Sequence, residues 1–181
     1  MYDIKTFVVF SLLTSFWLQL TAIDVEANYT NEQFENSLYD IGFKEVHKAV
    51  DDAEKFYRKK IELPVQFPPI RFTHIFGRFD DLEGDINDEL EITYINKDAT
   101  KNHYIISIKP SRYKLTLNPN LIDRTIPLKD GTSALLSNKK LGRFIVLFFE
   151  DEGWQYRLSL DSASPEKVSP DMLVDIANSL K

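Results

Sequence analysis

The sequence predicts an α+β fold with an antiparallel sheet of about six or seven strands, flanked by an N-terminal and a C-terminal helix. An amphipathic helical pattern comes first, a series of short β-rich segments follows, and a second helical stripe ends the chain. Because helices and strands are segregated rather than alternating, this order favours an antiparallel sheet over βαβ units. We expect a single domain over residues 43–181, after a targeting segment at 1–27 and a polar linker at 28–42.

The targeting segment contains an apolar run at residues 7–23, interrupted only by Ser, Thr and Gln. Val25 and Ala27 suit a signal-peptidase site, which predicts a signal peptide cleaved before Asn28. The run is at the lower edge of the roughly 17–25 residues that span a bilayer. A retained signal anchor and a buried core helix therefore stay open as alternatives. A lysine precedes the run and two acidic residues follow it, so the domain is expected outside the cytoplasm with or without cleavage.

Composition narrows the chemistry of this predicted secreted or cell-surface domain. The chain has no cysteine, which excludes disulfides, Cys-based zinc sites, lipid-modified cysteine and thiol catalysis. An exported domain without disulfides favours a bacterial source. The formal net charge is −6 and no basic stripe is present, so nucleic acid is not an expected partner. The expected partner is a protein or a cell-wall component, and the membrane is met only through the N-terminal segment.

Residues 28–42 are polar, and Thr30 with Gln33 predicts a capping box for one or two helical turns. Across residues 43–60, apolar side chains recur at three- and four-residue spacing, which predicts an amphipathic helix. The prolines within residues 63–69 exclude both a helix and a central strand there, and they predict an extended connector to the sheet.

The strands are expected in segments rich in Ile, Tyr, Phe and Thr that turn residues separate. These segments are residues 71–78, 89–96, 104–109, 124–128, 132–136, 143–149 and 155–160.

The core is predicted from the last two strands. Residues 144–149 are apolar throughout, so this strand is expected to be central and covered on both faces. After a tight turn at Gly153, apolar and polar residues alternate, which places Trp154, Tyr156 and Leu158 on one face beside the last helix. The predicted core residues are Phe144, Val146, Phe148, Trp154, Tyr156 and Leu158.

The last helix is expected to begin near Ser169, a capping residue, with Pro170 and Asp171 in its first turn. An apolar stripe follows, so this helix should pack on the sheet. One face of the sheet is then covered by helices, and the opposite face is expected to be partly open.

The order of these segments resembles an uncharacterised extracytoplasmic domain family of Bacillus-type Gram-positive bacteria. The resemblance covers about residues 45–181 and rests on the helix leading to Leu63-Pro64, Pro68-Pro69, and segments 90–94, 131–135, 154–158 and 176–180. In that family the domain often follows a membrane anchor, a lipoprotein signal or an anti-sigma-factor-like N-terminus. The resemblance implies an exported α+β module with no known activity; unlike the lipoprotein members, this chain has no cysteine.

The densest acidic run, residues 80–89, suggests a weak calcium site with Asp81, Glu83 and Asp85 as ligands. The run supplies carboxylate oxygens but lacks the Asp-x-Asx-x-Asx-Gly spacing of a calcium loop, so a solvated hairpin loop is the favoured interpretation. No other cofactor is expected.

Catalytic patterns are weak. The sequence has neither a Gly-x-Ser-x-Gly elbow nor a glycine-rich phosphate loop, and His47, His74 and His103 are far apart, which favours ordinary packing over a metal site. Alternation places Glu89 and Glu91 on one strand face, where a carboxylate pair for glycoside hydrolysis is the alternative to a solvated surface.

Aromatic residues are abundant, and an exposed row of them would suit carbohydrate or peptide binding. The candidates are Phe67, Phe72, Phe76, Phe79, Tyr94, Tyr104, Trp154 and Tyr156. The sequence therefore favours an exported binding module without catalytic activity. A carboxylate hydrolase acting on the cell wall and the sensor domain of a membrane-anchored regulator are the alternatives.

Overall fold

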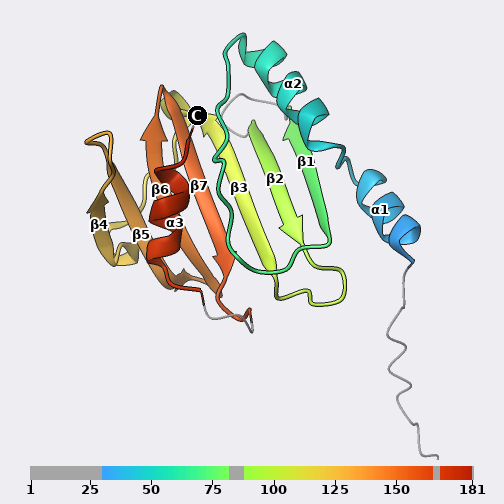
Figure 1. Ribbon diagram of the computed structural model, residues 1–181. Coiled ribbons are helices and arrows are strands. Elements are labelled where there is room, and N and C mark those ends of the chain that lie inside the picture. The colour runs from blue at the N-terminus through green and yellow to red at the C-terminus, as the bar shows by residue number, and fades with distance from the viewer. Residues whose placement is uncertain (1–29, 82–87, 165–167, 181) are drawn as a thin grey trace, which may run out of the picture.

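The computed structural model describes residues 30–81, 88–164 and 168–180, and it has the predicted α+β fold. Seven antiparallel strands form one open sheet in the order β1-β2-β3-β7-β6-β5-β4 (Figure 1). The strands are β1 His74–Asp80, β2 Glu89–Ile95, β3 His103–Pro110, β4 Arg124–Pro127, β5 Ser133–Leu141, β6 Phe144–Asp151 and β7 Trp154–Asp161. The predicted strand segments therefore all correspond to strands, and most ends agree within two residues.

The largest differences are at β1 and β5. β1 begins at His74 because the extended connector continues as far as Thr73, whose backbone N–H donates to Ile95. β5 runs on to Leu141 because its pairing with β6 continues past the apolar segment, with an irregular register between Asn138 and Leu141.

β7, rather than β6, is the middle strand, since it pairs with β3 on one side and β6 on the other. β6 is nevertheless interior and buried on both faces: the backbone alternation directs Leu147 and Phe149 to one side and Val146 and Phe148 to the other, all at most 4% exposed. The predicted two-sided burial is confirmed for residues 145–149, whereas the predicted core residue Phe144 is only half-buried.

Two helices cover one face of the sheet, here called the helix face. α2 (Val46–Tyr57) lies over β1, and α3 (Asp171–Ala177) packs on β6 (Figure 1). α2 begins three residues later than predicted because Lys44 forms a β-bridge with Gly77 on the outer edge of β1. It ends at Tyr57, and the next residue, Arg58, adopts the left-handed conformation at φ 53°.

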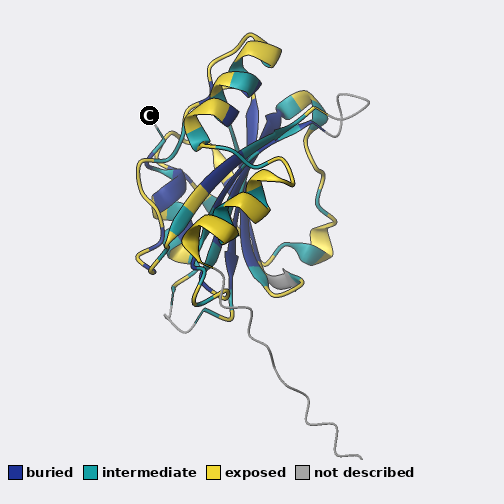
Figure 2. Cartoon of the chain, turned by 90° about the vertical axis from the view of Figure 1, so that its right-hand side faces the viewer, coloured by how far each residue is buried: buried dark blue, intermediate teal, exposed yellow. Residues whose placement is uncertain are grey.

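The opposite face carries the strap, residues 111–122, which contains two short 3₁₀ helices (Ser111–Tyr113 and Pro119–Leu121). Figure 2 shows the sheet nearly edge-on, with the strap standing off the side away from α2 and α3. The strap therefore covers part of this face with irregular chain.

Residues 31–39, inside the predicted linker, form α1 (Asn31–Tyr39). Its capping box is the predicted one: the Thr30 hydroxyl accepts from the Gln33 N–H, and the Gln33 side chain accepts from the Thr30 N–H. Phe34 packs against β1, with its ring centroid 5.0 Å from that of His74. The predicted signal segment lies outside the described residues. Within them, no helix combines the length and the apolar character that crossing a membrane requires.

The core lies between the sheet and the helices. Trp154, Tyr156 and Leu158 are at most 2% exposed, as predicted. They share one hydrophobic cluster with Leu173 and Ile176 of α3. The segment after α2 also contacts them: the Trp154 indole N–H donates to the Lys60 carbonyl, and the Tyr156 hydroxyl donates to the Glu62 carbonyl.

Candidate functional site

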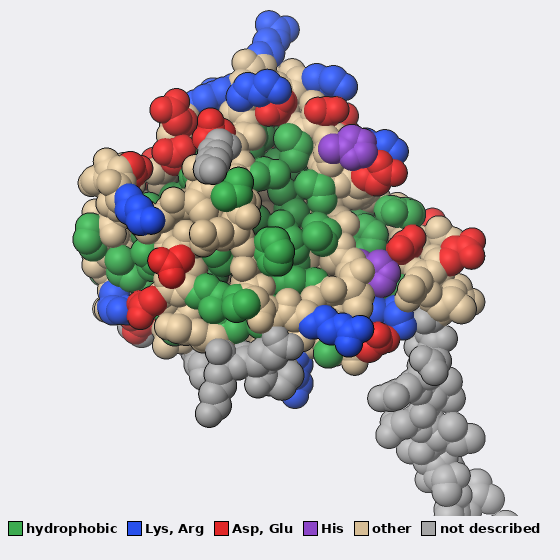
Figure 3. Space-filling model, viewed as in Figure 1, with side chains coloured by type: hydrophobic (Ala, Val, Ile, Leu, Met, Phe, Trp, Pro, Cys, Tyr) green, Lys and Arg blue, Asp and Glu red, His purple; other side chains and the backbone are tan. Residues whose placement is uncertain are grey.

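The helix face exposes an apolar surface formed by the connector and the neighbouring ends of β1 and β2. We call it the connector patch, and it consists of Val65, Phe67, Phe72, Ile75 and Tyr94. Figure 3 shows hydrophobic side chains gathered in the middle of this face, with charged side chains toward its rim. Val65 is 55%, Phe67 59% and Ile75 49% exposed.

The connector is extended because of its prolines, and backbone contacts hold it to the domain. Pro64 forms a β-bridge with Leu180, and the Val65 N–H donates to the Ser179 carbonyl at 3.2 Å. Ile70, which is buried, holds the far end. Phe67 lies between these anchors, so its exposed position is fixed by the backbone on both sides.

Tyr94 joins the members of the patch. Phe67 stacks on its ring at a centroid distance of 6.1 Å and an interplanar angle of 24°, and the Phe72 ring lies 5.4 Å away. Ile75 is directly opposite Tyr94 in the β1–β2 register, so the two side chains share a face. Burial raises the pKa of the Tyr94 hydroxyl, so the ring is neutral across physiological pH.

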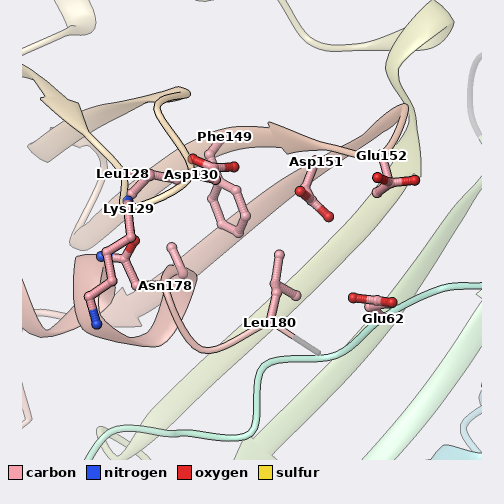
Figure 4. Close-up of a pocket in the computed structure, with 10 residues that line it drawn as sticks. Glu62, Leu128, Lys129, Asp130, Phe149, Asp151, Glu152, Asn178 and Leu180 are labelled. Atoms are coloured by element: carbon pink, nitrogen blue, oxygen red, sulfur yellow. The ribbon is translucent and has the colours of Figure 1, made fainter.

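A second site is the acidic pocket, about 280 Å³ in volume, between the connector and the β6–β7 turn. Its carboxylates come from Glu62, Asp130, Asp151 and Glu152, and Lys129 also lines it. Figure 4 shows Asp151 and Glu62 pointing into the same space beside Leu180. Three separate segments therefore bring acidic side chains to one cavity.

Asp151 has the perturbed carboxyl group of this pocket. Desolvation raises its pKa, the nearby carboxylates of Glu152 and Asp130 raise it further, and Lys59 opposes them. A carboxyl group that holds its proton more firmly is what a general acid needs. The sequence did not single out these acids, because they are far apart in the chain and each stands in an ordinary turn or connector.

The predicted calcium ligands are only partly placed. Asp81 is exposed just after β1, whereas Glu83 and Asp85 lie outside the described residues. Neighbouring Asp80 is held by Arg78, whose Nε lies 3.0 Å from the carboxylate. Within residues 30–81, 88–164 and 168–180, no group of three or more His, Asp or Glu side chains could hold a metal ion. The calcium site stays a prediction.

The three histidines occupy separate environments. His47 is exposed beside Glu45, and His74 stacks on Phe76 with its side chain 8% exposed. Burial lowers the pKa of His103, which lies near the Phe144 ring. None of these positions brings two histidines together.

Glu89 and Glu91 share the strap face, as alternation predicts, and both have cationic partners. Arg157 donates to Glu89 at 2.8 Å, and Arg78 lies 3.7 Å from Glu91. The Thr93 hydroxyl also donates to Glu91. These contacts hold the two carboxylates within the sheet surface.

Most of the aromatic candidates belong to the core. Phe76, Tyr104, Trp154 and Tyr156 are at most 3% exposed. Phe67 is the exception at 59% exposed; among the large hydrophobic residues of the described chain, only Ile41, at 60%, is more exposed. Sequence reasoning identified Phe67 as a candidate but did not select Val65 or Ile75, since aliphatic residues on a predicted connector or strand give no separate signal.

Comparison of the chain with protein-family models, with curated proteins and with solved structures finds no significant match. The resemblance to the extracytoplasmic family of Bacillus-type bacteria therefore stays a prediction.

Proposed function

We propose that the chain is an exported, cell-surface binding module without catalytic activity, and that its connector patch docks a protein partner. The observation that carries this proposal is the pair of exposed apolar side chains beside Tyr94, Phe67 and Ile75, with exposed Val65 two residues before Phe67 on the connector. Singly exposed apolar residues are normal on a protein surface, whereas a contiguous patch with a polar rim is typical of an interaction site.

The composition of the patch favours a protein over a glycan. Aromatic rings stack on sugars, but the aliphatic side chains of Val65 and Ile75 offer no hydrogen bond to sugar hydroxyls. An apolar centre with aromatic members is the usual core of a protein interface. Phe67 is the expected hot spot, because it is the exposed ring with an aromatic support beneath it.

The test uses the full chain, produced with its own N-terminus in a Gram-positive host. A photo-crosslinking phenylalanine analogue replaces Phe67, or replaces Leu115 as a matched control, since Leu115 is 43% exposed on the strap face. We expect a discrete protein adduct from position 67 alone. The purified partner should then bind the Phe67→Ala variant at least about tenfold more weakly, the size expected for a hot spot. Because Phe67 is exposed, the melting temperature of this variant should stay that of the wild type.

Identical adducts from both positions, or unchanged affinity in Phe67→Ala, would exclude the patch as the docking site. Binding to isolated cell-wall sacculi that depends on Phe67 would replace the protein partner with a glycan.

The acidic pocket favours one other function, a cell-wall hydrolase with Asp151 as general acid. Inverting and retaining glycosidases both use paired carboxyl groups, and the raised pKa of Asp151 suits the acid. Release of soluble fragments from peptidoglycan by the wild type, but not by Asp151→Asn of equal melting temperature, would establish this activity. Equal absence of release from both proteins leaves the binding module as the proposed function.

A further inference from the structure

A second cavity lies on the other side of the sheet, under the strap, and is independent of the connector patch. This strap pocket has a volume of about 360 Å³, within the roughly 300–1,000 Å³ of small-molecule sites. Val146 and Phe148 of β6 line it from the sheet, and Leu115 and Leu117 line it from the strap. The two β6 residues are 3% and 4% exposed, so the cavity reaches the apolar surface of the sheet.

The strap is tied to the sheet on both sides of the pocket. The Leu115 N–H donates to the Gln155 side chain at 2.8 Å, and the Gln155 amide donates back to the Leu115 carbonyl at 3.0 Å. At the other end, the Asp123 carboxylate accepts from the Asn138 N–H at 2.6 Å. The pocket is therefore preformed by hydrogen bonds and does not depend on a ligand to open it.

Two polar residues line this otherwise apolar pocket, Arg157 and Ser159. Arg157 Nη2 donates to Glu89 at 2.8 Å and to Ser107 at 2.7 Å. The N–H groups on the other two guanidinium nitrogens can donate to a ligand. Ser159 is 8% exposed, and no side-chain hydrogen bond joins it to another described residue. An unpaired hydroxyl at the edge of an apolar cavity is suited to a polar group on a ligand.

The charge of the site selects among ligands. The Arg157 guanidinium repels a cation at the pocket wall, while the Glu89 carboxylate already compensates its positive charge. A ligand carboxylate would lose its hydration and meet a cation that is already paired. A neutral acceptor loses less hydration and can still accept hydrogen bonds from Arg157 and Ser159.

We propose that the strap pocket binds a small neutral amphipathic molecule, an aliphatic chain or ring that ends in a hydroxyl or carbonyl group. The apolar body lies between the strap leucines and β6, and the polar end meets Arg157 and Ser159.

The test measures displacement of a fluorescent apolar probe, N-phenyl-1-naphthylamine, from the full chain by 1-decanol, decanoate and decylamine at pH 7. We expect 1-decanol to bind at least about threefold more tightly than decanoate, and decylamine not to bind. Filling the pocket with Ser159→Leu should abolish displacement. Thr125→Ala, an exposed β4 change on the same face, should leave it unchanged.

The Glu89→Gln variant tests the charge argument separately, since glutamine keeps an acceptor for Arg157 but removes the compensating charge. It should invert the preference, so that decanoate binds more tightly than 1-decanol. Unchanged selectivity in this variant, binding of decylamine, or displacement that survives Ser159→Leu but is lost in Phe67→Ala would each overturn the proposal. Melting curves of each variant confirm that it is folded before binding is compared.

Discussion

Gly77 is the residue at which α2 and β1 come closest. A Cβ atom at this position would lie 2.7 Å from the Ala49 Cβ and 3.0 Å from the Val46 Cα. Real Cβ contacts are not this short, so any side chain would push the helix away from the strand. The glycine is therefore required by helix–sheet packing, since its backbone conformation is an ordinary one.

Gly77→Ala should lower the free energy of unfolding by about 1–3 kcal/mol, the range for overpacked sites. Chemical denaturation measures it. The double variant with Ala49→Gly removes one of the two close contacts, so its cost should be smaller than the sum of the two single costs. If the losses in free energy of unfolding were additive, residues 49 and 77 would not be in steric contact in the Gly77→Ala variant.

At the scale of elements, the strap shows how irregular chain covers a sheet face. Its two 3₁₀ helices are single turns, and the strap is held by Gln155, whose side chain bonds both the N–H and the carbonyl of Leu115. Lys114 adds an ion pair with Glu150, but both side chains are more than 40% exposed. The buried amide, at 6% exposed, should therefore matter more than the surface ion pair.

Gln155→Leu should raise the hydrogen-exchange rate of the Leu115 amide by about fivefold, corresponding to the roughly 1 kcal/mol net value of a hydrogen bond. Lys114→Ala, which removes only the exposed ion pair, should change that rate much less. If both variants raised the exchange rate of the Leu115 amide equally, the ion pair would stabilise the strap as much as the Gln155 hydrogen bonds do.

At the scale of the whole molecule, stability depends on pH through groups that burial perturbs. Burial lowers the pKa of His103 below its ordinary 6.5, and the charges of Glu91 and Asp161 oppose this effect. Below the ordinary value, the unfolded chain binds a proton that the folded chain resists, so stability falls as pH falls. Burial raises the pKa of Asp151 above its ordinary 3.8. Between the ordinary and the raised value the folded chain binds a proton that the unfolded chain has released, so the contribution of Asp151 to stability falls as pH rises.

The melting temperature should therefore fall between pH 7 and pH 5.5, and His103→Gln should flatten that slope. His47→Gln, at an exposed position, is the control and should keep the wild-type slope. A slope that persists unchanged in the His103 variant would assign it to other groups.

Periodicity explains which parts of this molecule could be predicted from sequence. The alternation around Trp154 and the continuous apolar run in β6 placed strands and core, because burial imposes those patterns directly. The candidate sites follow from topology instead. Phe67 contacts Tyr94 because the connector crosses the helix face. Glu62 and Asp151 line one pocket because the β6–β7 turn lies beside the start of that connector. Contacts between segments so far apart in the chain leave no local pattern in the sequence.

The chain wraps around one border of its sheet: α1 packs on β1 through Phe34, Lys44 bridges Gly77 along the outer side, and α2 lies over the helix face. The other border is β4, a four-residue strand that ends in Pro127. An exposed strand border is where a second chain adds by backbone pairing, and short length, proline and covering chain all oppose this. Both borders thus oppose the addition of a second chain by backbone pairing, which leaves the apolar side chains of the connector patch, rather than a strand border, as the surface for a partner.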